Sequence, residues 1–245
     1  MKMENRTLQW LQFAALLVAV VAITMVGLAG PANKFGVLNW HTALTGVIWG
    51  AYVGVAAAVL ALIALILRAT QRKGVFWCVL ALVLGGVAVY FPMQLKKQAQ
   101  AVPPIHDITT DTRSPPQFVV LLAARGKDSN SVEYDPDVGE QQQKAYPDIE
   151  PLMLEETVDK AWPRALATAK AMGWQVAASE LADGQIEATD TTAWFGFKDD
   201  IVIRVHQFDP GHTRIDVRSV SRVGKSDLGA NAARIRKYLK AVQGA

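Results

Sequence analysis

Apolar positions run almost without interruption through the first part of the chain and alternate with polar ones in its last part. Three apolar runs occupy about residues 10–30, 43–67 and 75–95. A helix of about 20 apolar residues crosses a hydrocarbon core of about 30 Å, so each run is long enough to span a bilayer. The pattern therefore predicts a transmembrane region over residues 1–97 with three spans.

Residues 98–150 show no sustained periodicity of apolar and polar positions. Proline pairs at 103–104 and 115–116 favour extended backbone, and residues 128–143 are polar and rich in glutamine. We predict one short strand at 118–123 and a surface excursion at 128–143. The rest of this region is expected to be an extended, irregular linker that packs on the domain that follows.

Residues 151–245 change from helical to strand periodicity and back again. Thr157 can cap a helix that Gly173 ends, and a second helix begins near Leu228. Between the helices lie four alternating runs with turn residues between them, at 174–179, 184–192, 200–207 and 213–222. The order helix, four-stranded antiparallel sheet, helix predicts an α+β domain in which both helices grip one face of the sheet.

Two local expectations accompany these helices. Pro163 suits the first helix only close to its start, because a proline further along removes a helical hydrogen bond. In the last helix, the helical period places Ile235 and Leu239 on the buried side and Arg234 on the solvent side.

The two faces of the predicted sheet differ in polarity. Ile201, Ile203 and Val205 share the face that would meet the helices. The opposite face carries polar and charged side chains: Glu187, Thr189, Thr191, Arg204, His206, Arg214, Asp216, Arg218 and Arg222. That face is either solvated, with weak cross-strand ion pairs, or covered by the segment 103–118 or by a ligand.

Charge divides the chain at the same place as hydrophobicity. Up to His106 there are eight basic residues and a single acid, Glu4, which is a net charge of +7. The remainder carries a net charge of −4, which leaves +3 for the whole chain. Because ionised side chains are costly in hydrocarbon, the long stretch without carboxylates agrees with a membrane location.

Basic residues outside the spans predict the orientation. Two precede the first span, and Arg68, Arg72 and Lys73 lie between the second and third, whereas Lys34 alone lies between the first and second. The positive-inside rule then places the N-terminus in the cytoplasm and the C-terminal domain in the periplasm. The chain would be a multi-pass protein of the inner (cytoplasmic) membrane, although the two lysines at 96–97 argue weakly for the opposite orientation.

An alternative interpretation makes the first run a cleaved signal peptide. Lys2 and Arg6 would form its basic region, and the sequence at 28–30 resembles a cleavage site. The second and third runs would still return the C-terminal half to the outside.

A stripe of small residues follows the second span, with Gly46, Gly50, Gly54 and Ala58 at every fourth position. Small residues let helices approach closely in lipid. The stripe predicts either packing against the other two spans of the same chain or the interface of a homodimer. No acidic residue falls within the spans, so the region is typical of an anchor rather than of a transporter or proton pump.

The most concentrated group of candidate binding residues lies where the last strand gives way to the last helix. It comprises Arg222, Lys225, Ser226, Asp227, Asn231 and Arg234. A helix N-terminus with basic residues nearby suits an anion, but Ser226 or Asp227 can equally satisfy the free amides of the first turn. The sequence lacks the spacing of a phosphate-binding loop, because no glycine stands five residues before Gly224.

A second polar group belongs to the linker. It comprises His106, Asp111 and Arg113. The segment 103–118 has little periodicity of its own, so we expect it to pack near the start of the last helix. This would bring Asp111 and Arg113 close to Arg222, Asp227 and Asn231 and complete a ligand or anion site.

Evidence for catalysis is weak. The sequence contains no His-x-x-x-His or Cys-x-x-Cys spacing, so neither a metal nor a cofactor is predicted. Cys78, the single cysteine, falls within the third span. Nucleic acid is disfavoured as a partner because the soluble half is net acidic. An envelope hydrolase or transferase with a polar site around Ser219–Asn231 remains the alternative to a binding module.

Several separated motifs carry a resemblance to a known family. They are Pro104-Ile-His-Asp-Ile-Thr-Thr-Asp111, Tyr146-Pro-Asp148, Ile186-Glu-Ala-Thr189, Trp194-Phe-Gly-Phe-Lys-Asp-Asp200 and the run Arg218–Arg234. Over about residues 103–243 the chain resembles the domain-of-unknown-function family 1499. The resemblance implies a protein of the bacterial envelope or an organellar lumen, with no established activity and no catalytic residues to carry over.

The order of elements is also similar to the helix-grip domains of outer-membrane assembly lipoproteins, which is a likeness of fold alone. Together these observations predict a membrane-anchored extracytoplasmic domain that acts as a binding or accessory module of the cell envelope. Membrane lipids and envelope proteins are the expected partners.

Overall fold

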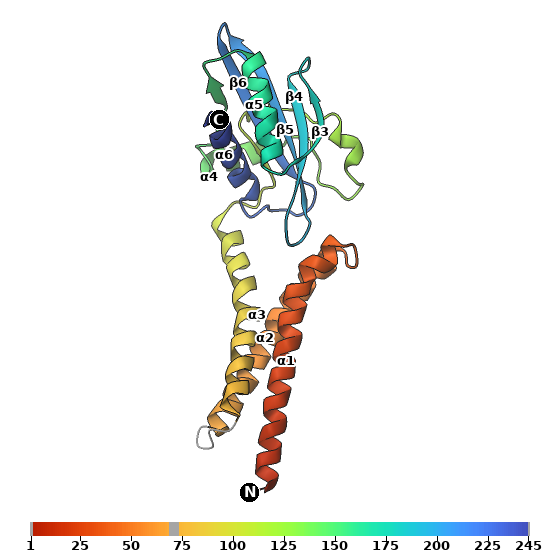
Figure 1. Ribbon diagram of the computed structural model, residues 1–245, viewed down its shortest axis with the longest axis vertical. Coiled ribbons are helices and arrows are strands. Elements are labelled where there is room, and N and C mark those ends of the chain that lie inside the picture. The colour runs from red at the N-terminus through yellow and green to blue at the C-terminus, as the bar shows by residue number, and fades with distance from the viewer. Residues whose placement is uncertain (1, 69–73, 245) are drawn as a thin grey trace. The chain divides into compact units, whose positions relative to one another are not determined.

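The computed structural model of the protein describes residues 2–68 and 74–244, which divide into two compact units (Figure 1). The first unit comprises Met1–Gln98 together with Ala193–Gly196, and the second comprises Ala99–Thr192 with Phe197–Ala245. Arg72 and Lys73, on which the orientation argument partly depends, lie outside the described residues.

Three long helices form the first unit: α1 (Lys2–Lys34), α2 (Trp40–Arg68) and α3 (Val75–Ala101). Each is long and apolar enough to cross a membrane, which confirms the three predicted apolar helices. The first and third continue beyond the predicted spans and contain Pro31 and Pro92. Prolines are tolerated in such helices because neighbouring groups satisfy the backbone atoms that they leave free.

Small residues bring these helices together. A Cβ placed on Gly54 would lie 2.9 Å from the carbonyl oxygen of Gly85 on α3, and one on Gly50 would lie 2.7 Å from Val26 on α1. Ala58 belongs to the same contact, since its backbone nitrogen lies 3.2 Å from a Cβ placed on Gly85. Three residues of the stripe on α2 therefore pack within the chain, as one of its two predicted roles required, whereas nothing lies within 4 Å of a Cβ placed on Gly46. A homodimer through the stripe stays a prediction.

The second unit contains an antiparallel sheet. Its described strands are β1 (Asp107–Thr109), β2 (Leu152–Leu154), β3 (Gln175–Glu180), β4 (Gln185–Thr191), β5 (Lys198–Asp209) and β6 (His212–Ser221). The order is β1-β6-β5-β4-β3, and β2 also pairs with β6. The four predicted strands are β3 to β6.

The described sheet has six strands rather than the four predicted. The two additional strands share the outer edge of β6, where Ile108 pairs with Ser219 and Met153 pairs with Arg214. Each is only three residues long, too short to show an alternating period, so their identity as strands depends on β6 and not on their own sequence.

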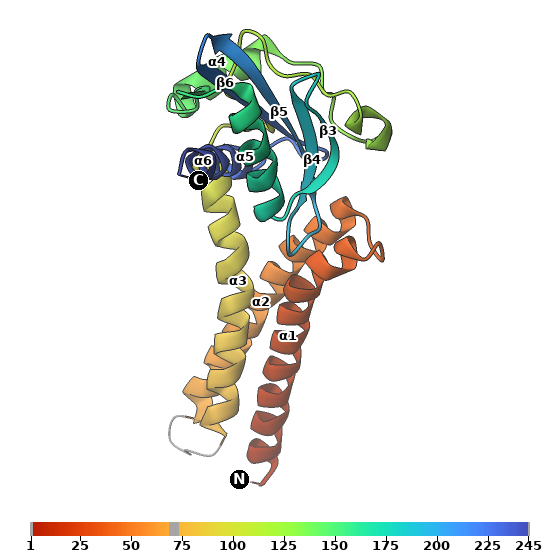
Figure 2. The same ribbon diagram turned by 45° about the horizontal axis from the view of Figure 1, so that its top comes forward.

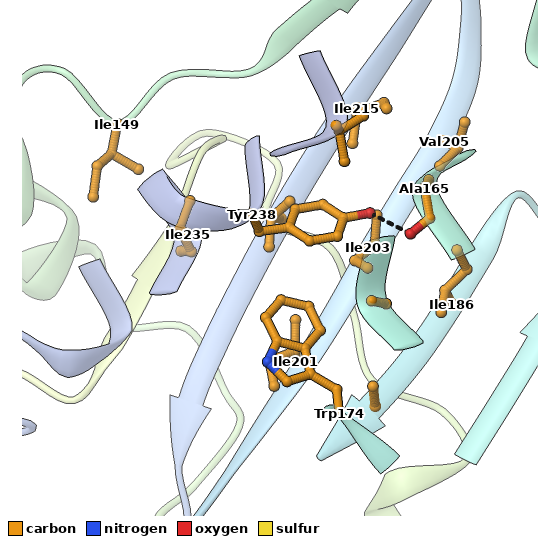
Figure 3. Close-up of a cluster of buried hydrophobic side chains, with 14 of the residues drawn as sticks. Ile149, Ala165, Trp174, Ile186, Ile201, Ile203, Val205, Ile215, Ile235 and Tyr238 are labelled. Atoms are coloured by element: carbon orange, nitrogen blue, oxygen red, sulfur yellow. Dashed lines mark hydrogen bonds between the residues drawn. The ribbon is translucent and has the colours of Figure 1, made fainter. Parts of the chain in front are cut away.

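Two helices, α5 (Val158–Ala171) and α6 (Ala230–Gln243), lie on the same face of the sheet, as predicted (Figure 1 and Figure 2). Between them Trp174 stacks on Tyr238 with ring centroids 5.1 Å apart, and the Tyr238 hydroxyl donates to the Ala165 carbonyl at 3.0 Å (Figure 3). Thr157 stands at the N-cap position of α5 without a capping hydrogen bond from its side chain, and Pro163 stands well inside the helix rather than close to its start.

The segment between β1 and β2 contains structure that the sequence reading missed. Residues Leu121–Ala124 form the short 3-10 helix η1 where a strand was predicted. Pro136–Ala145 form α4 within the stretch predicted as a surface excursion. Asp135 caps α4 by accepting from the Asp137 amide at 2.9 Å, and Pro136 opens the helix, so the Asp-Pro pair was an available signal.

The second face of the sheet is buried under this segment. Phe118 and Leu121 pack on Val202 and Val220. Glu187, which is 1% exposed, accepts hydrogen bonds from the three successive amides of residues 119–121 at 2.8–3.1 Å. The prediction of a solvated face is therefore wrong for its centre, and the chain itself supplies the cover. The covering residues lie largely beyond the segment 103–118 that was considered for this role.

The contact between α2 and α3 yields a matched pair of variants. We expect Gly54→Ala to destabilise the protein by about 1–3 kcal/mol, because the added methyl would press on the Gly85 carbonyl. Gly46→Ala is the control in the same helix: nothing lies within 4 Å of its added carbon, and the change should stay within about 1 kcal/mol. Thermal melting of the full chain in detergent compares the two, and equal shifts would contradict the packing.

Candidate functional site

The predicted site residue Arg222 belongs to a buried cluster on the second face, formed by Thr189, Asp200, Arg125 and Arg222 (the Asp200 cluster). Asp200 is fully buried and accepts from Arg222 at 2.8–3.1 Å, from Arg125 at 2.6 Å and from the Thr189 hydroxyl at 2.8 Å. Arg222 also donates to the Ala124 carbonyl at 2.9 Å. The cluster thus ties strands β4, β5 and β6 to the residues around η1.

Arg218, at the centre of the same face, was not singled out as a site residue. Its guanidinium is fully buried and binds Asp107 through two hydrogen bonds of 3.0 and 2.7 Å. It also donates to the carbonyls of Pro116 and Val132 at 3.2 and 2.7 Å. The ring of Tyr134 lies 5.3 Å away, and burial raises the pKa of this tyrosine to about 12.

Asp111 belongs to neither of these groups and lies beside Arg204 and Arg214. Its Oδ2 accepts from Arg204 at 3.2 Å and from Arg214 at 2.8 Å, and both arginines also bind the buried Asp216. Burial would raise the pKa of Asp111, but hydrogen bonds from the amides of residues 113 and 114 and the two guanidinium groups hold it below its usual value. Arg113 itself is exposed.

The predicted approach of Asp111 and Arg113 to Arg222, Asp227 and Asn231 is wrong. Strand β1 runs antiparallel to β6, with Asp107 opposite Val220 and Thr109 opposite Arg218. The chain beyond β1 therefore travels toward the start of β6, as the bond from the Thr110 amide to the Val217 carbonyl shows. This direction leads away from the start of α6.

His106, by contrast, does meet the start of α6, though through its main chain. Asn231 is fully buried, and its amide donates to the His106 carbonyl and to the Ser221 hydroxyl, each at 3.0 Å. Its Oδ1 accepts from the Ser219 hydroxyl at 2.7 Å and from Arg234. The side chains of Ser219, Ser221, Asn231 and Arg234 thus form one hydrogen-bonded cluster.

Arg234 was expected on the solvent side of the last helix and is instead 8% exposed. It binds Asp190 at 2.8 Å and Asp199 at 2.5 Å, which flank the connection between β4 and β5. The helical period alone could not indicate this, because the two carboxylates come from a distant part of the chain. Arg234 thereby joins α6 to the sheet.

The loop before α6 caps its own helix. Asp227 accepts from the amides of Gly229 and Asn231, both at 2.8 Å, and the Ser226 hydroxyl accepts from the Leu228 amide at 3.2 Å. Burial raises the pKa of Asp227 although these hydrogen bonds oppose the shift. Asp227 thus occupies the place at the helix N-terminus that the alternative prediction assigned to an external anion.

The predicted candidates are therefore divided among the two faces of the sheet. Arg222 lies on the second face, Asp227, Asn231 and Arg234 lie at the start of α6, and Lys225 is exposed. Within the described residues no group of three or more His, Cys, Asp or Glu side chains is arranged to hold a metal ion. Ligand binding by these candidate residues stays a prediction.

The family described as "Protein of unknown function (DUF1499)" matches residues 107–242, more than half of the chain. The chain belongs to the DUF1499 family. The match begins at β1 and ends within α6, and it confirms the family resemblance seen in the motifs. No curated protein matches the sequence.

The DUF1499 motifs now have structural positions in this chain. The motif at 104–111 supplies Asp107 to Arg218 and the His106 carbonyl to Asn231. The motif at 186–189 supplies Glu187 and Thr189 to the covered face. The polar residues of these two motifs thus form hydrogen bonds that join separate elements of the DUF1499 domain to one another.

Replacing Arg222 separates a structural role from a binding role. We expect Arg222→Ala to lower the free energy of unfolding by about 3 kcal/mol, because buried Asp200 would lose one of its two cations. Lys225→Ala, at an exposed position three residues along, should change it by less than about 0.5 kcal/mol. Chemical denaturation of the full chain in detergent measures both, and an unchanged Arg222→Ala protein would argue against the structural role.

Proposed function

We propose that this DUF1499 protein is a membrane-anchored binding or accessory module of the cell envelope, with its α+β domain in the periplasm. Three helices able to cross a membrane support the anchor. The acid-free stretch between Glu4 and Asp107 and the basic residues near Arg6 and Arg68 support a cytoplasmic N-terminus. The same charge distribution supports an inner-membrane location.

Reporter fusions test the orientation directly. A cytoplasmic reporter should be active when joined after Gly74, and a periplasmic reporter when joined after Gln100, because the positive-inside rule places the second loop in the cytoplasm. The reciprocal fusions at the same two positions are the controls. Reversed signals would overturn the orientation but not the membrane anchor.

The observation that carries the binding role is an exposed apolar patch on the covering segment. Val119, Val120 and Leu122 are 65%, 49% and 46% exposed (the η1 patch). Their backbone is held in place, because Glu187 binds the amides of residues 119–121 and Leu121 is buried beneath. Contiguous exposed apolar side chains mark interaction sites on protein surfaces, so the η1 patch supports the docking of another protein.

The alternative of an envelope hydrolase or transferase around Ser219–Asn231 has less support. Ser219 and Asn231 are fully buried and hydrogen-bonded to each other at 2.7 Å. A nucleophile must reach its substrate, and a buried hydroxyl that already donates to an amide oxygen is poorly placed to do so.

Site-specific photo-crosslinking in cells tests the η1 patch. A photoreactive residue at Val119 should give one discrete protein adduct, and the same residue at exposed Lys170 on α5 should not. Leu122→Asp should reduce that adduct at least several-fold without loss of the folded protein, because an exposed substitution changes binding more than stability. A background pattern equal to that at Lys170 would contradict the proposal.

A further inference from the structure

A pocket of about 500 Å³ lies in the first unit, where the end of α2 and the beginning of α3 meet the N-terminal part of α1. Its described lining residues are Gln9, Gln12, Phe13, Leu16, Arg68, Gly74 and Trp77. A second pocket of about 460 Å³ shares Gln9 and Phe13 with it and adds Arg6 and Trp10. The two pockets are neighbours through these shared residues, and together they are called the hollow.

One side of this hollow is polar and cationic. Arg68 is 3% exposed and Gln12 is 7% exposed, and the Gln12 amide donates to the Gly74 carbonyl at 2.6 Å. Gly74 makes this approach possible, since a Cβ there would lie 2.6 Å from the Gln12 Oε1 and 3.0 Å from an Arg68 nitrogen. The lining residues of both pockets include two arginines and two glutamines and no carboxylate.

The other side is apolar and open to the surroundings of the helices. Phe13 and Trp77 are 58% and 49% exposed, and Leu16 completes the wall. Trp77 stands in the first turn of α3, and tryptophans at the ends of membrane helices favour the headgroup layer. The hollow therefore has cationic side chains on one side and an apolar wall on the other.

We propose that this hollow is a binding site for an anionic phospholipid. The guanidinium of Arg68, with Arg6 and the amides of Gln9 and Gln12, would bind the headgroup phosphate, since arginine forms paired hydrogen bonds to phosphate oxygens. The acyl chains would lie along Phe13, Leu16 and Trp77. Anionic headgroups are concentrated where cationic residues border a span, which favours this occupant over a zwitterionic lipid.

The site rests on the membrane-anchor part of the proposed function and on neither the orientation nor the η1 patch. A free phosphate ion would use the cationic end alone, whereas a lipid uses both sides of the hollow. The two sources can therefore be told apart by changing the apolar side while the arginines stay in place.

Native mass spectrometry of the full chain released from detergent tests the proposal with phosphatidylglycerol and phosphatidylcholine as probes. Phosphatidylglycerol should be retained in preference to phosphatidylcholine. Arg68→Gln should weaken its retention about tenfold, because one charge-assisted contact is lost. Lys97→Gln, at an exposed position in the last turns of α3, is the charge-matched control and should retain the lipid as before. Circular dichroism of each variant verifies that the helices remain folded.

A second variant keeps both arginines and both glutamines. Phe13→Gln replaces an exposed ring of the apolar wall, which lines both pockets, with a polar side chain and should reduce lipid retention because the acyl chains lose that wall. Equal retention of the two lipids, or unchanged retention in a folded Arg68→Gln protein, would overturn the proposal. Displacement of the lipid by millimolar inorganic phosphate, with no effect of Phe13→Gln, would assign the site to a free anion and overturn it as well. Failed reporter or crosslinking results would leave this outcome unaffected.

Discussion

The buried guanidinium of Arg218 is the constraint on which the second unit depends. It stands at the middle of β6 with no exposure to solvent, where a charge without partners would cost several kcal/mol. Asp107 supplies a two-point partner, and the carbonyls of Pro116 and Val132 accept further hydrogen bonds. Asp107 belongs to β1, and the two carbonyls belong to the segment between β1 and α4, so the hydrogen bonds of one cation hold that segment across the face of the sheet.

The same principle explains the other polar residues of the covered face. Glu187 is satisfied by the amides that lead into η1, and Asp200 by Arg125 and Arg222. Burial of these charges is tolerated because each has a hydrogen-bonded partner, supplied either by the covering segment or by a neighbouring strand. The η1 patch is a consequence, since the hydrogen bonds that hold the segment leave its valine side chains facing outward.

The two units achieve their packing by different means. In the second unit large side chains such as Ile203, Trp174 and Tyr238 fill the core, as expected where removal of apolar surface from water drives folding. In the first unit the described core is made of small residues, among them Ala19, Ala57 and Gly54. Lipid tails are as apolar as the side chains, so close contact between helices replaces burial as the source of stability.

The sequence by itself determined the features that repeat locally. The three apolar helices, the strands β3 to β6, the helices α5 and α6 and a cap at Ser226 or Asp227 follow from hydrophobic periods and from turn and cap residues within a few positions of each other. These features depend on the periodicity of the local backbone and on residues close in sequence, so they need no distant partner. The family motifs were also recognisable at this level.

Only the tertiary structure decided the features that depend on distant partners. The strands β1 and β2 are too short to carry a period and exist because β6 offers an edge. The direction of β1 sends Asp111 to Arg204 and Arg214 instead of to the start of α6, and two remote carboxylates draw Arg234 inward. A buried charged side chain requires a partner of opposite charge or hydrogen-bonding groups. Its position in the sequence does not specify which partner the folded chain brings within reach.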